Sequence, residues 1–510
     1  MGITRQQLQK MALQIDEVIN LIQRQQAIDG ILPAEVCPVY RESAKNLLHY
    51  ATFRSFDARN MQKGLKQLGL TRLANSEGNI LGSIINLKII VNSLLGSAPD
   101  LSKKEFLSIG DGAKLLVKHT DELFGTNTKS RRVRIMVTQP TEAATNYDMV
   151  LHMVKNGMDC ARINCAHDGP DVWKAIIDNV RKAAKECSAT VKVAMDLTGS
   201  KVRTGSIDFT VQGKRSKASK KKEKQFIPLN KGDHLIVTDR ENGATLPEYD
   251  KNGIVVKPAT IGCVPSQIIQ RVKKGEPILF DDGKIEGEVV ETASESFRVK
   301  ITRAKVGGAK LKGEKGINLP TLDLGISGLT DKDREDLKFV VAHADIVNYS
   351  YVNDENDVDD LLYELKRLGA DEELGIILKI ETNLAYRNLI SILISAMQRK
   401  HLGIMIARGD LALEVGWKNM GMVQEGILSF CSAAHIPVVW ATQVLESLAK
   451  KGMPSRSEIT DITSSVQAEC VMLNKGPHVN EAISFLDEVL INVEDYHYKK
   501  EVLLPRMNWN

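Results

Sequence analysis

The sequence predicts an α/β fold: a (β/α)8 TIM barrel with an inserted small β-rich domain and an α-helical N-terminal domain. Three observations favour this fold. Short apolar runs alternate with amphipathic helical patterns from residue 131 onward, one long interval of different texture interrupts them, and helical periodicity dominates the first 125 residues. A doubly wound sheet is the alternative for the alternating part. The chain has 510 residues, which is enough for about three domains.

The N-terminal module is expected over residues 1–125. Between residues 8 and 22, apolar side chains recur every three or four positions, which indicates one buried helix face. The stretch 76–96 is more strongly apolar, and we expect Ser76 to cap it and Gly96 to end it. No pattern in this module indicates chemistry, so we expect it to dock on the rest of the chain or on a partner.

The barrel is expected to occupy residues 126–205 and 319–495, followed by a C-terminal tail over 496–510. Its strands are short β-type runs with helical patterns between them, as a parallel barrel requires. The eight runs are VRIMVT (133–138), CARINC (160–165), VKVAMDL (191–197), DIVNYSY (345–351), GIILKIE (375–381), GIMIARG (403–409), PVVWAT (437–442) and CVMLN (470–474).

The interval 206–318 has short β-like pieces, such as HLIVTD and FRVKITR, separated by Gly and Pro. This texture predicts a small all-β domain inserted after the third barrel strand. The interval contains GKRSKASKKKEK (213–224), a run of basic residues. We expect this run to be a solvated loop, and a phosphate- or nucleic-acid-binding role is the less favoured alternative.

The composition is that of a soluble globular protein, with 43% hydrophobic and 26% charged residues. Lys and Arg number 68 and Asp and Glu 64, giving a net charge of +4, which is too balanced to predict a nucleic-acid partner. The seven cysteines form no C-x-x-C pair, which favours a reducing compartment. No apolar run reaches the roughly 20 residues of a membrane span, and the N-terminus has no apolar region of the kind found in a secretory signal. We therefore expect a cytoplasmic protein with neither a nucleic-acid nor a membrane partner.

Polar side chains gather where the predicted barrel strands end. Active sites of (β/α)8 enzymes lie at that carboxyl face. A rim salt bridge would explain any one of these residues, but five strands that contribute together favour an active site. The residues are Arg162, Asn164, Asp196, Lys379, Glu381, Arg408, Asp410, Thr442 and Gln443.

The residue types narrow the chemistry. Glu381 and Asp410 are carboxylates on neighbouring strand ends and suit a hard divalent cation, Mg²⁺ or Mn²⁺. Lys379, Arg162 and Arg203 supply positive charge beside it, and a metal with Lys and Arg is typical of phosphoryl transfer. The chain has neither a Walker A motif nor a kinase Gly-rich loop.

Several segments occur in the order and spacing of a known family. They are GMDCARINCAHDG (157–169), AMDLTGSKVRTG (194–205), FDDGKI (280–285), KGINLP (315–320), LKIET (378–382), IMIARGDLALE (404–414), ATQVLES (441–447), PSRSEITD (454–461) and CVMLN (470–474). On these motifs the chain resembles the pyruvate kinase family over about residues 131–490. The resemblance implies a barrel with a β-rich lid domain after strand three, which agrees with the insertion expected from texture.

The resemblance also implies a reaction: transfer of the phosphoryl group of phosphoenolpyruvate to ADP, giving pyruvate and ATP, with Mg²⁺ or Mn²⁺ as cofactor. Glu381 and Asp410 would ligate the metal. Lys379 would neutralise the phosphoryl group during transfer, with Arg162 on its other side. The backbone at Gly409 and Asp410, together with the Thr442 hydroxyl, would bind the substrate carboxylate. Thr442 would also lie near the face at which the enolate is protonated.

Nucleotide contacts are implied at five positions. Asn164, His167, Arg203 and Lys315 match positions that contact the nucleotide phosphates, and Arg203 is also among the expected catalytic residues. Asp282 matches a lid residue that approaches the nucleotide when the lid closes. Closure would exclude water and limit hydrolysis.

The monovalent-cation site departs from the family pattern. Many family members bind K⁺ near the substrate, but two of the usual ligand positions are Ala166 and Leu197 here. Lys201 stands where such members carry Glu, and its ammonium would substitute for K⁺. We therefore expect activity without K⁺, and the alternative is a solvated Lys201 with the cation site simply lost.

Two further departures concern the end of the barrel. Strand eight ends in Asn474-Lys475-Gly476-Pro477, where the family usually has Ser-Gly-Glu-Thr, so slow turnover or altered substrate choice is one expectation. The chain ends at Asn510, so we expect neither the family's C-terminal regulatory domain nor regulation through it.

Three hypotheses follow from these features. The first is a K⁺-independent pyruvate kinase. The second is a catalytically weak protein that binds phosphoenolpyruvate or nucleotide as a sensor or scaffold. The third is another metal-dependent enzyme of phosphoenolpyruvate or pyruvate, such as a carbon–carbon lyase, which would not need Lys315 and Asp282. A homo-oligomer formed through the barrel or the N-terminal module is compatible with each.

Overall fold

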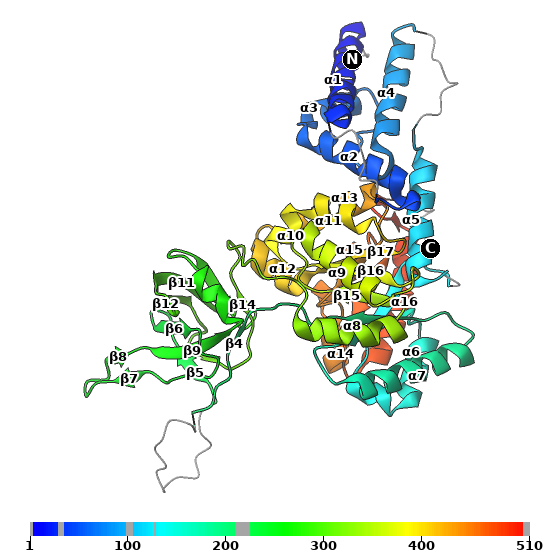
Figure 1. Ribbon diagram of the computed structural model, residues 1–510. Coiled ribbons are helices and arrows are strands. Elements are labelled where there is room, and N and C mark those ends of the chain that lie inside the picture. Colours follow the sequence, from blue (N-terminus) through cyan, green and yellow to red (C-terminus); the bar gives the residue numbers. More distant parts are fainter. Residues whose placement is uncertain (1–3, 29–34, 98–105, 127–128, 210–224, 503–510) are drawn as a thin grey trace.

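The structure, a computed structural model, describes residues 4–28, 35–97, 106–126, 129–209 and 225–502 (Figure 1). The basic run 213–224 lies outside the described residues. Within the described part, no helix combines the length and apolarity needed to cross a membrane.

The centre of the molecule is a closed barrel of eight parallel strands, so the predicted fold class is confirmed. Each strand falls within one of the eight predicted apolar runs or starts one residue before it. The strands are buried along almost their whole length, because helices cover the outside of the barrel and side chains fill the inside. They are β1 (Arg134–Thr138), β2 (Cys160–Asn164), β3 (Lys192–Asp196), β15 (Ile346–Tyr349), β16 (Gly375–Ile380), β17 (Leu402–Ala407), β18 (Val438–Ala441) and β19 (Cys470–Leu473).

Helices follow the strands and surround the barrel (Figure 1). They are α6 (Tyr147–Lys155), α7 (Pro170–Glu186), α8 (Asp331–His343), α9 (Glu355–Arg367), α10 (Asn383–Arg387), α11 (Leu389–Ala396), α12 (Arg408–Val415), α13 (Met420–Ala433), α14 (Glu446–Lys451), α15 (Arg456–Ser465) and α16 (Val479–Glu494). A short hairpin, β20 (His497–Tyr498) and β21 (Glu501–Val502), follows the last helix.

Helix α5 (Ile109–Phe124) closes the bottom of the barrel, where the strands begin. Its Leu123 and Phe124 belong to the buried cluster inside the barrel. Gly375 is the first residue of β16 and Gly403 the second residue of the neighbouring β17, and a Cβ on them would lie 2.6 Å and 2.8 Å from Leu123, respectively. The two glycines therefore make room for the helix that seals the barrel.

The N-terminal module is helical as predicted: α1 (Arg5–Ile28), α2 (Arg41–Ser55), α3 (Arg59–Gln67) and α4 (Ile80–Leu94) precede α5. The predicted apolar stripe of α1 is buried, and α1 and α4 project together beyond the barrel (Figure 1). The prediction that Ser76 caps α4 is wrong. A 3-10 turn over Glu77–Asn79 intervenes, so α4 starts at Ile80 and Ser76 makes no capping hydrogen bond.

The module packs on the barrel through a buried polar contact. His435 precedes β18, and its ring nitrogens lie 2.9 Å from Ser43 Oγ and 2.8 Å from the carbonyl oxygen of Gly78. Asn46 donates a hydrogen bond of 2.8 Å to the Ala433 carbonyl beside it. Burial lowers the pKa of His435 to about 4.

His435 should make stability depend on pH. The unfolded chain binds a proton at this histidine below about pH 6.5, whereas the folded chain does so only near pH 4, so stability falls as pH falls through this window. Relative to pH 7, the wild type should lose about 2 kcal/mol at pH 5 that His435→Asn does not lose. Asn is chosen because residue 435 has φ +50°, which Asn tolerates. Urea unfolding at both pH values measures this, with exposed His152→Asn as control. Equal pH dependence in wild type and His435→Asn would contradict the assignment.

The lid domain is a seven-stranded sheet in the order β14-β10-β11-β12-β6-β9-β4, with its own buried core. Figure 1 shows it beside the barrel, joined through extended segments. Strand β8 lies within the predicted β-like piece GIVVK (253–257), but the other two- and three-residue strands were not predicted, because such short strands carry no periodicity. The seven strands of this sheet are β4 (Arg203–Thr204), β6 (His234–Thr238), β9 (Ala259–Val264), β10 (Pro277–Phe280), β11 (Ile285–Thr292), β12 (Ser296–Arg303) and β14 (Ile317–Asn318). Two further pairs form separate two-stranded sheets: β5 (Ile227–Leu229) with β13 (Ala309–Leu311), and β7 (Glu248–Tyr249) with β8 (Val255–Lys257).

Candidate active site

Four charged side chains from three barrel strands form a buried row at the carboxyl face. The guanidinium of Arg162 lies 2.6 Å from Asp196 Oδ2, and Lys379 Nζ lies 3.3 Å from the same oxygen. Lys379 Nζ is also 3.2 Å from Glu381 Oε1. Charges therefore alternate in sign, which is how a protein keeps several ionised groups out of water.

Asp196 holds this row together. Burial alone would raise its pKa, but Arg162 and Lys379 outweigh burial and lower the pKa of Asp196 to about 2. The strand register sets Asn348 beside it, and the Asn348 amide donates a hydrogen bond to Oδ1. Arg162 also donates to Thr138 Oγ1 at 2.9 Å, while its Nε is buried and has no partner within the described residues.

Lys379 is held as a cation. Burial lowers the pKa of Lys379, but Glu381 and Asp196 reverse this, so the net direction is upward. Its ammonium donates to Ser350 Oγ at 2.7 Å. The pKa of Glu381 is raised by burial and by the nearby charge of Asp410, against the attraction of Lys379. The two carboxylates thus lie close enough to repel each other.

Asp410 lies in the first turn of α12, directly after β17. Lys201 Nζ is 2.6 Å from its Oδ1, and the Tyr351 hydroxyl donates to its Oδ2 at 3.0 Å. The Tyr351 backbone N–H donates to Glu381 Oε2 at 2.7 Å. Sequence reasoning placed Lys201 near the monovalent-cation position, but in the structure it makes no hydrogen bond or ion pair with Asn164 or Asp196 among the described residues.

Thr442 follows β18 in a strained loop. Thr442 and Gln443 have φ values of +67° and +56°, which are uncommon for such residues. Arg408 secures the loop through hydrogen bonds to the Ala441 carbonyl at 2.9 Å and to the Thr442 carbonyl. Thr442 Oγ1 is buried without a partner in the described part of the chain, and a Cβ on Gly409 would lie 3.8 Å from it. The glycine at position 409 therefore leaves the space beside this buried hydroxyl open.

Asn164 and His167 lie on the rim next to Arg162. Together with Asn474 and Lys475, which directly follow β19, they line a cavity of about 240 Å³. Asn164 accepts a hydrogen bond from the Ala166 backbone at 3.0 Å. Both predicted rim residues therefore border one cavity, and the departure at strand eight forms part of its wall.

Arg203, Asp282 and Lys315 lie on the lid side. Arg203 donates to the Glu314 carbonyl at 3.2 Å, and Lys315 Nζ is 3.6 Å from Asp281. Asp282 lies in a tight turn at φ +56°. Among the described residues, none of these three makes a hydrogen bond or ion pair with the row around Lys379. The structure therefore divides the predicted nucleotide residues between the barrel rim and the lid.

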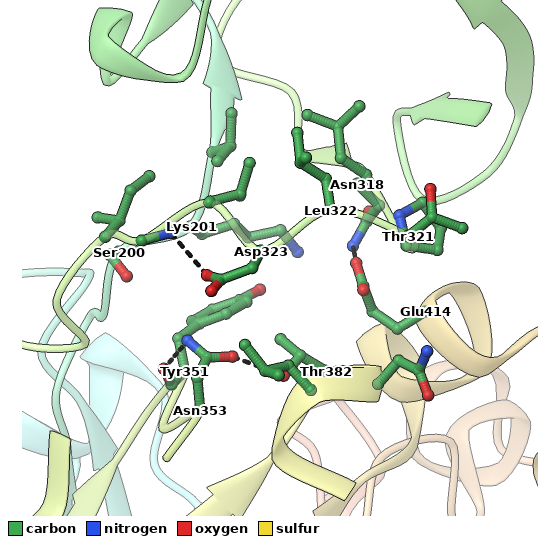
Figure 2. A pocket seen from close by; sticks show the side chains of 18 of the residues that line it. Ser200, Lys201, Asn318, Thr321, Leu322, Asp323, Tyr351, Asn353, Thr382 and Glu414 are labelled. Atoms are coloured by element: carbon green, nitrogen blue, oxygen red, sulfur yellow. Dashed lines mark hydrogen bonds between the residues drawn. The ribbon is translucent and has the colours of Figure 1, made fainter. Parts of the chain in front are cut away.

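A second cavity of about 240 Å³ lies between the barrel and the two segments that lead into and out of the lid (Figure 2). Lys201 and Asn318 come from these segments, and Tyr351 and Glu414 come from the barrel. Asn318 donates to Glu414 at 2.8 Å, and burial raises the pKa of Glu414 to about 7. Both lid segments are thus bound to α12, through Asp410 and Glu414.

Sequence reasoning missed Tyr351, Ser350, Asn348 and Glu414. The first three lie in the second half of the fourth apolar run, DIVNYSY (345–351). The rule that polar residues near strand ends form the site would therefore have included them. Glu414 lies one helical turn after Asp410, and that spacing places both on one face of α12.

Comparisons with known proteins point to one family. The model of the pyruvate kinase barrel domain matches residues 130–478. The chain is 31% identical to pyruvate kinase of Thermotoga maritima over 68% of each chain. It is 30% identical to pyruvate kinase 1 of Trypanosoma brucei brucei, covering 73% of this chain and 69% of that one.

Coverage differs among the relatives. The chain is 28% identical to a pyruvate kinase of Staphylococcus epidermidis over 71% of its own length but only 57% of that protein. A solved structure of a pyruvate kinase from Cryptosporidium parvum aligns with a TM-score of 0.61 at 25% identity, covering 73% of this chain and 72% of that one.

Proposed function

The chain belongs to the pyruvate kinase family, and we propose that it transfers the phosphoryl group of phosphoenolpyruvate to ADP, giving pyruvate and ATP. The observation that carries this proposal is the cationic Lys379, held in its buried row with Arg162, Asp196 and Glu381, with the second carboxylate Asp410 close to Glu381. A transferring phosphoryl group spreads negative charge over its oxygens, and fixed cations in a dry site stabilise that charge.

Glu381 and Asp410 fit a divalent cation, Mg²⁺ or Mn²⁺. Both offer carboxylate oxygens, and the raised pKa of Glu381 reflects in part a repulsion from Asp410 that a cation between them would relieve. The described ranges contain no group of three or more His, Cys, Asp or Glu side chains arranged for a metal, so substrate oxygens and water would complete its coordination. The bound cation would supply charge neutralisation at the transferring group.

Each remaining group has a role that its position supports. Arg162 Nε, buried and unpartnered, donates to a phosphoryl oxygen, and Lys379 neutralises the group as it moves. The Thr442 hydroxyl and the backbone at Gly409 and Asp410 bind the substrate carboxylate. The bond from phosphorus to the enol oxygen breaks while a new bond to ADP forms. The enolate then takes up a proton on the face near Thr442.

ADP binds between the rim and the lid. Asn164 and His167 border the rim cavity, and Arg203, Lys315 and Asp282 lie on the lid side. Movement of the lid, residues 206–318, toward the barrel, residues 126–205 and 319–495, brings the two halves of the nucleotide site together. Such closure excludes water and favours transfer over hydrolysis.

A catalytically weak binding protein is the second candidate. The cavity wall contributed by Asn474 and Lys475 favours it, because the family's serine near the path of proton delivery is replaced there. Pyruvate formation from phosphoenolpyruvate, ADP and Mg²⁺ decides between the two. Pyruvate above the level made by Asp410→Asn supports the enzyme. Binding of phosphoenolpyruvate without turnover supports the second candidate.

Activity should not require K⁺. Lys201 brings a fixed ammonium into the site, with its side chain 15% exposed, and such a charge replaces a bound monovalent cation. The rate should be equal with and without KCl when tetramethylammonium chloride keeps the ionic strength constant. Lys201→Glu should instead show activity that rises with K⁺. A wild type that needs K⁺ would keep the enzyme but contradict this role of Lys201.

A further inference from the structure

Tyr351 is the one described residue with hydrogen bonds to both proposed metal carboxylates. Its backbone N–H reaches Glu381 Oε2 at 2.7 Å, and its hydroxyl reaches Asp410 Oδ2 at 3.0 Å. Glu381 follows β16 and Asp410 lies in α12 after β17, so one residue spans two neighbouring strand ends. The phenol ring fixes the spacing between these two hydrogen bonds.

The backbone of Tyr351 is held in an unusual conformation. Its φ is +59°, in the left-handed region that a bulky residue rarely adopts. The ring packs against the first lid segment, where a Cβ on Gly199 would lie 2.9 Å from Tyr351 Cδ2. Gly199 thus permits an approach that another residue would prevent. The surroundings therefore impose the orientation of both the N–H and the hydroxyl.

The other oxygen of Asp410 faces Lys201. The ion pair between Lys201 Nζ and Oδ1 measures 2.6 Å, so both carboxylate oxygens have partners (Figure 2 shows Lys201 and Tyr351 in the adjoining cavity). A cation that binds Asp410 competes with the ammonium at Oδ1, while the hydroxyl can stay on Oδ2. The two partners should therefore affect metal binding in opposite directions.

We propose that Tyr351 is a positioning residue for the divalent cation: its N–H orients Glu381 and its hydroxyl orients Asp410. This inference rests on the proposed function, since it assumes that these carboxylates bind the metal. Hydrogen-bond partners of metal ligands fix ligand orientation, and their loss weakens metal affinity about 10- to 100-fold. Tyr351→Phe removes only the hydroxyl, and the backbone contact to Glu381 remains.

The test is direct titration of the substrate-free, full-length protein with Mn²⁺, with free Mn²⁺ measured by electron paramagnetic resonance. Tyr351→Phe should raise the Kd for Mn²⁺ at least about 10-fold. Lys201→Met should lower it, because the competing ammonium is gone. The apparent KM for Mg²⁺ should rise in Tyr351→Phe while the KM for ADP stays the same. A general loss of structure would change both.

Tyr349→Phe is the matched control. Tyr349 lies two residues earlier in β15, is fully buried, and its hydroxyl has no hydrogen-bond partner within the described residues. Its Kd for Mn²⁺ should equal that of the wild type. If Tyr351→Phe binds Mn²⁺ as the wild type does, or if Tyr349→Phe loses as much affinity, the positioning role is overturned and the proposed function stands.

The variant Asp410→Asn tests the proposed metal site itself, on which the role of Tyr351 depends. If the wild type has a Mn²⁺ site that this variant lacks, the proposed metal site is supported and the comparison at Tyr351 is decisive. If the wild type and Asp410→Asn bind Mn²⁺ equally, the metal assignment fails and the role of Tyr351 fails with it. Lys201→Met tests the competition at Asp410 separately, because unchanged or weaker Mn²⁺ binding in this variant would overturn that competition.

Discussion

Lys379→Met is expected to lower the rate of phosphoryl transfer about 10³-fold and to leave divalent-metal binding measurable. The Lys379 ammonium is buried and is kept charged by Glu381 and Asp196. It lies 3.2 Å from Glu381 Oε1, and Glu381 is one of the two carboxylates proposed to bind the metal. Methionine has a similar shape but leaves the developing negative charge without this cation. Because Glu381 and Asp410 both remain, Mn²⁺ should still bind. Pyruvate formation measured at saturating substrate gives the rate, and Mn²⁺ titration gives the affinity.

The control for this variant is Lys338→Met, an exposed lysine on α8 that pairs with Glu335. Its rate should equal that of the wild type. A wild-type rate in Lys379→Met would place the chemistry elsewhere than the barrel rim. Loss of both turnover and Mn²⁺ binding would indicate that the lysine shapes the site instead of stabilising the transfer.

The row around Lys379 could be predicted from the sequence, because the geometry of a parallel barrel brings the ends of its strands together. Arg162, Asp196 and Lys379 lie in or at the end of runs whose strand character was clear, and parallel register then sets these side chains on one rim. A shift of register by one residue would exchange the side chains inside the barrel with those under the helices, and the two faces hold different side chains.

The contacts of Asp410 could not be predicted from the sequence. Lys201 is 209 positions away in the sequence and belongs to a lid segment, so its partner depends on how that segment enters the barrel. Tyr351 reaches Asp410 only because its backbone takes a left-handed conformation, for which its sequence gives no signal. The wrong prediction of a cap at Ser76 also came from a local backbone conformation that the sequence did not indicate. A short 3-10 turn precedes α4, so this helix starts after Ser76.

Asp196→Asn should destabilise the barrel by about 3–5 kcal/mol. Asp196 is 1% exposed and is the ion-pair partner of Arg162 as well as of Lys379. The amide keeps the volume but removes the charge, so Arg162 and Lys379 lose the counter-ion that they share, and among the described residues Lys379 keeps only Glu381. The pKa of Asp196, lowered to about 2 from 3.8, means that its stabilisation is complete above about pH 4 and is lost as pH falls through 2. The deficit of the variant in urea unfolding should therefore be the same at pH 5 and pH 8.

Asp178→Asn provides the comparison, because it removes an exposed carboxylate that pairs with Lys174 on the same helix. An exposed pair of this kind contributes less than about 1 kcal/mol to stability. The difference between the two variants therefore measures how much burial increases the cost of losing a carboxylate charge. Equal stability of Asp196→Asn and the wild type would mean that Glu381 compensates both cations. Because Glu381 would then be unavailable to a metal, that result would also predict weaker Mn²⁺ binding, and the same protein sample can be titrated to find out.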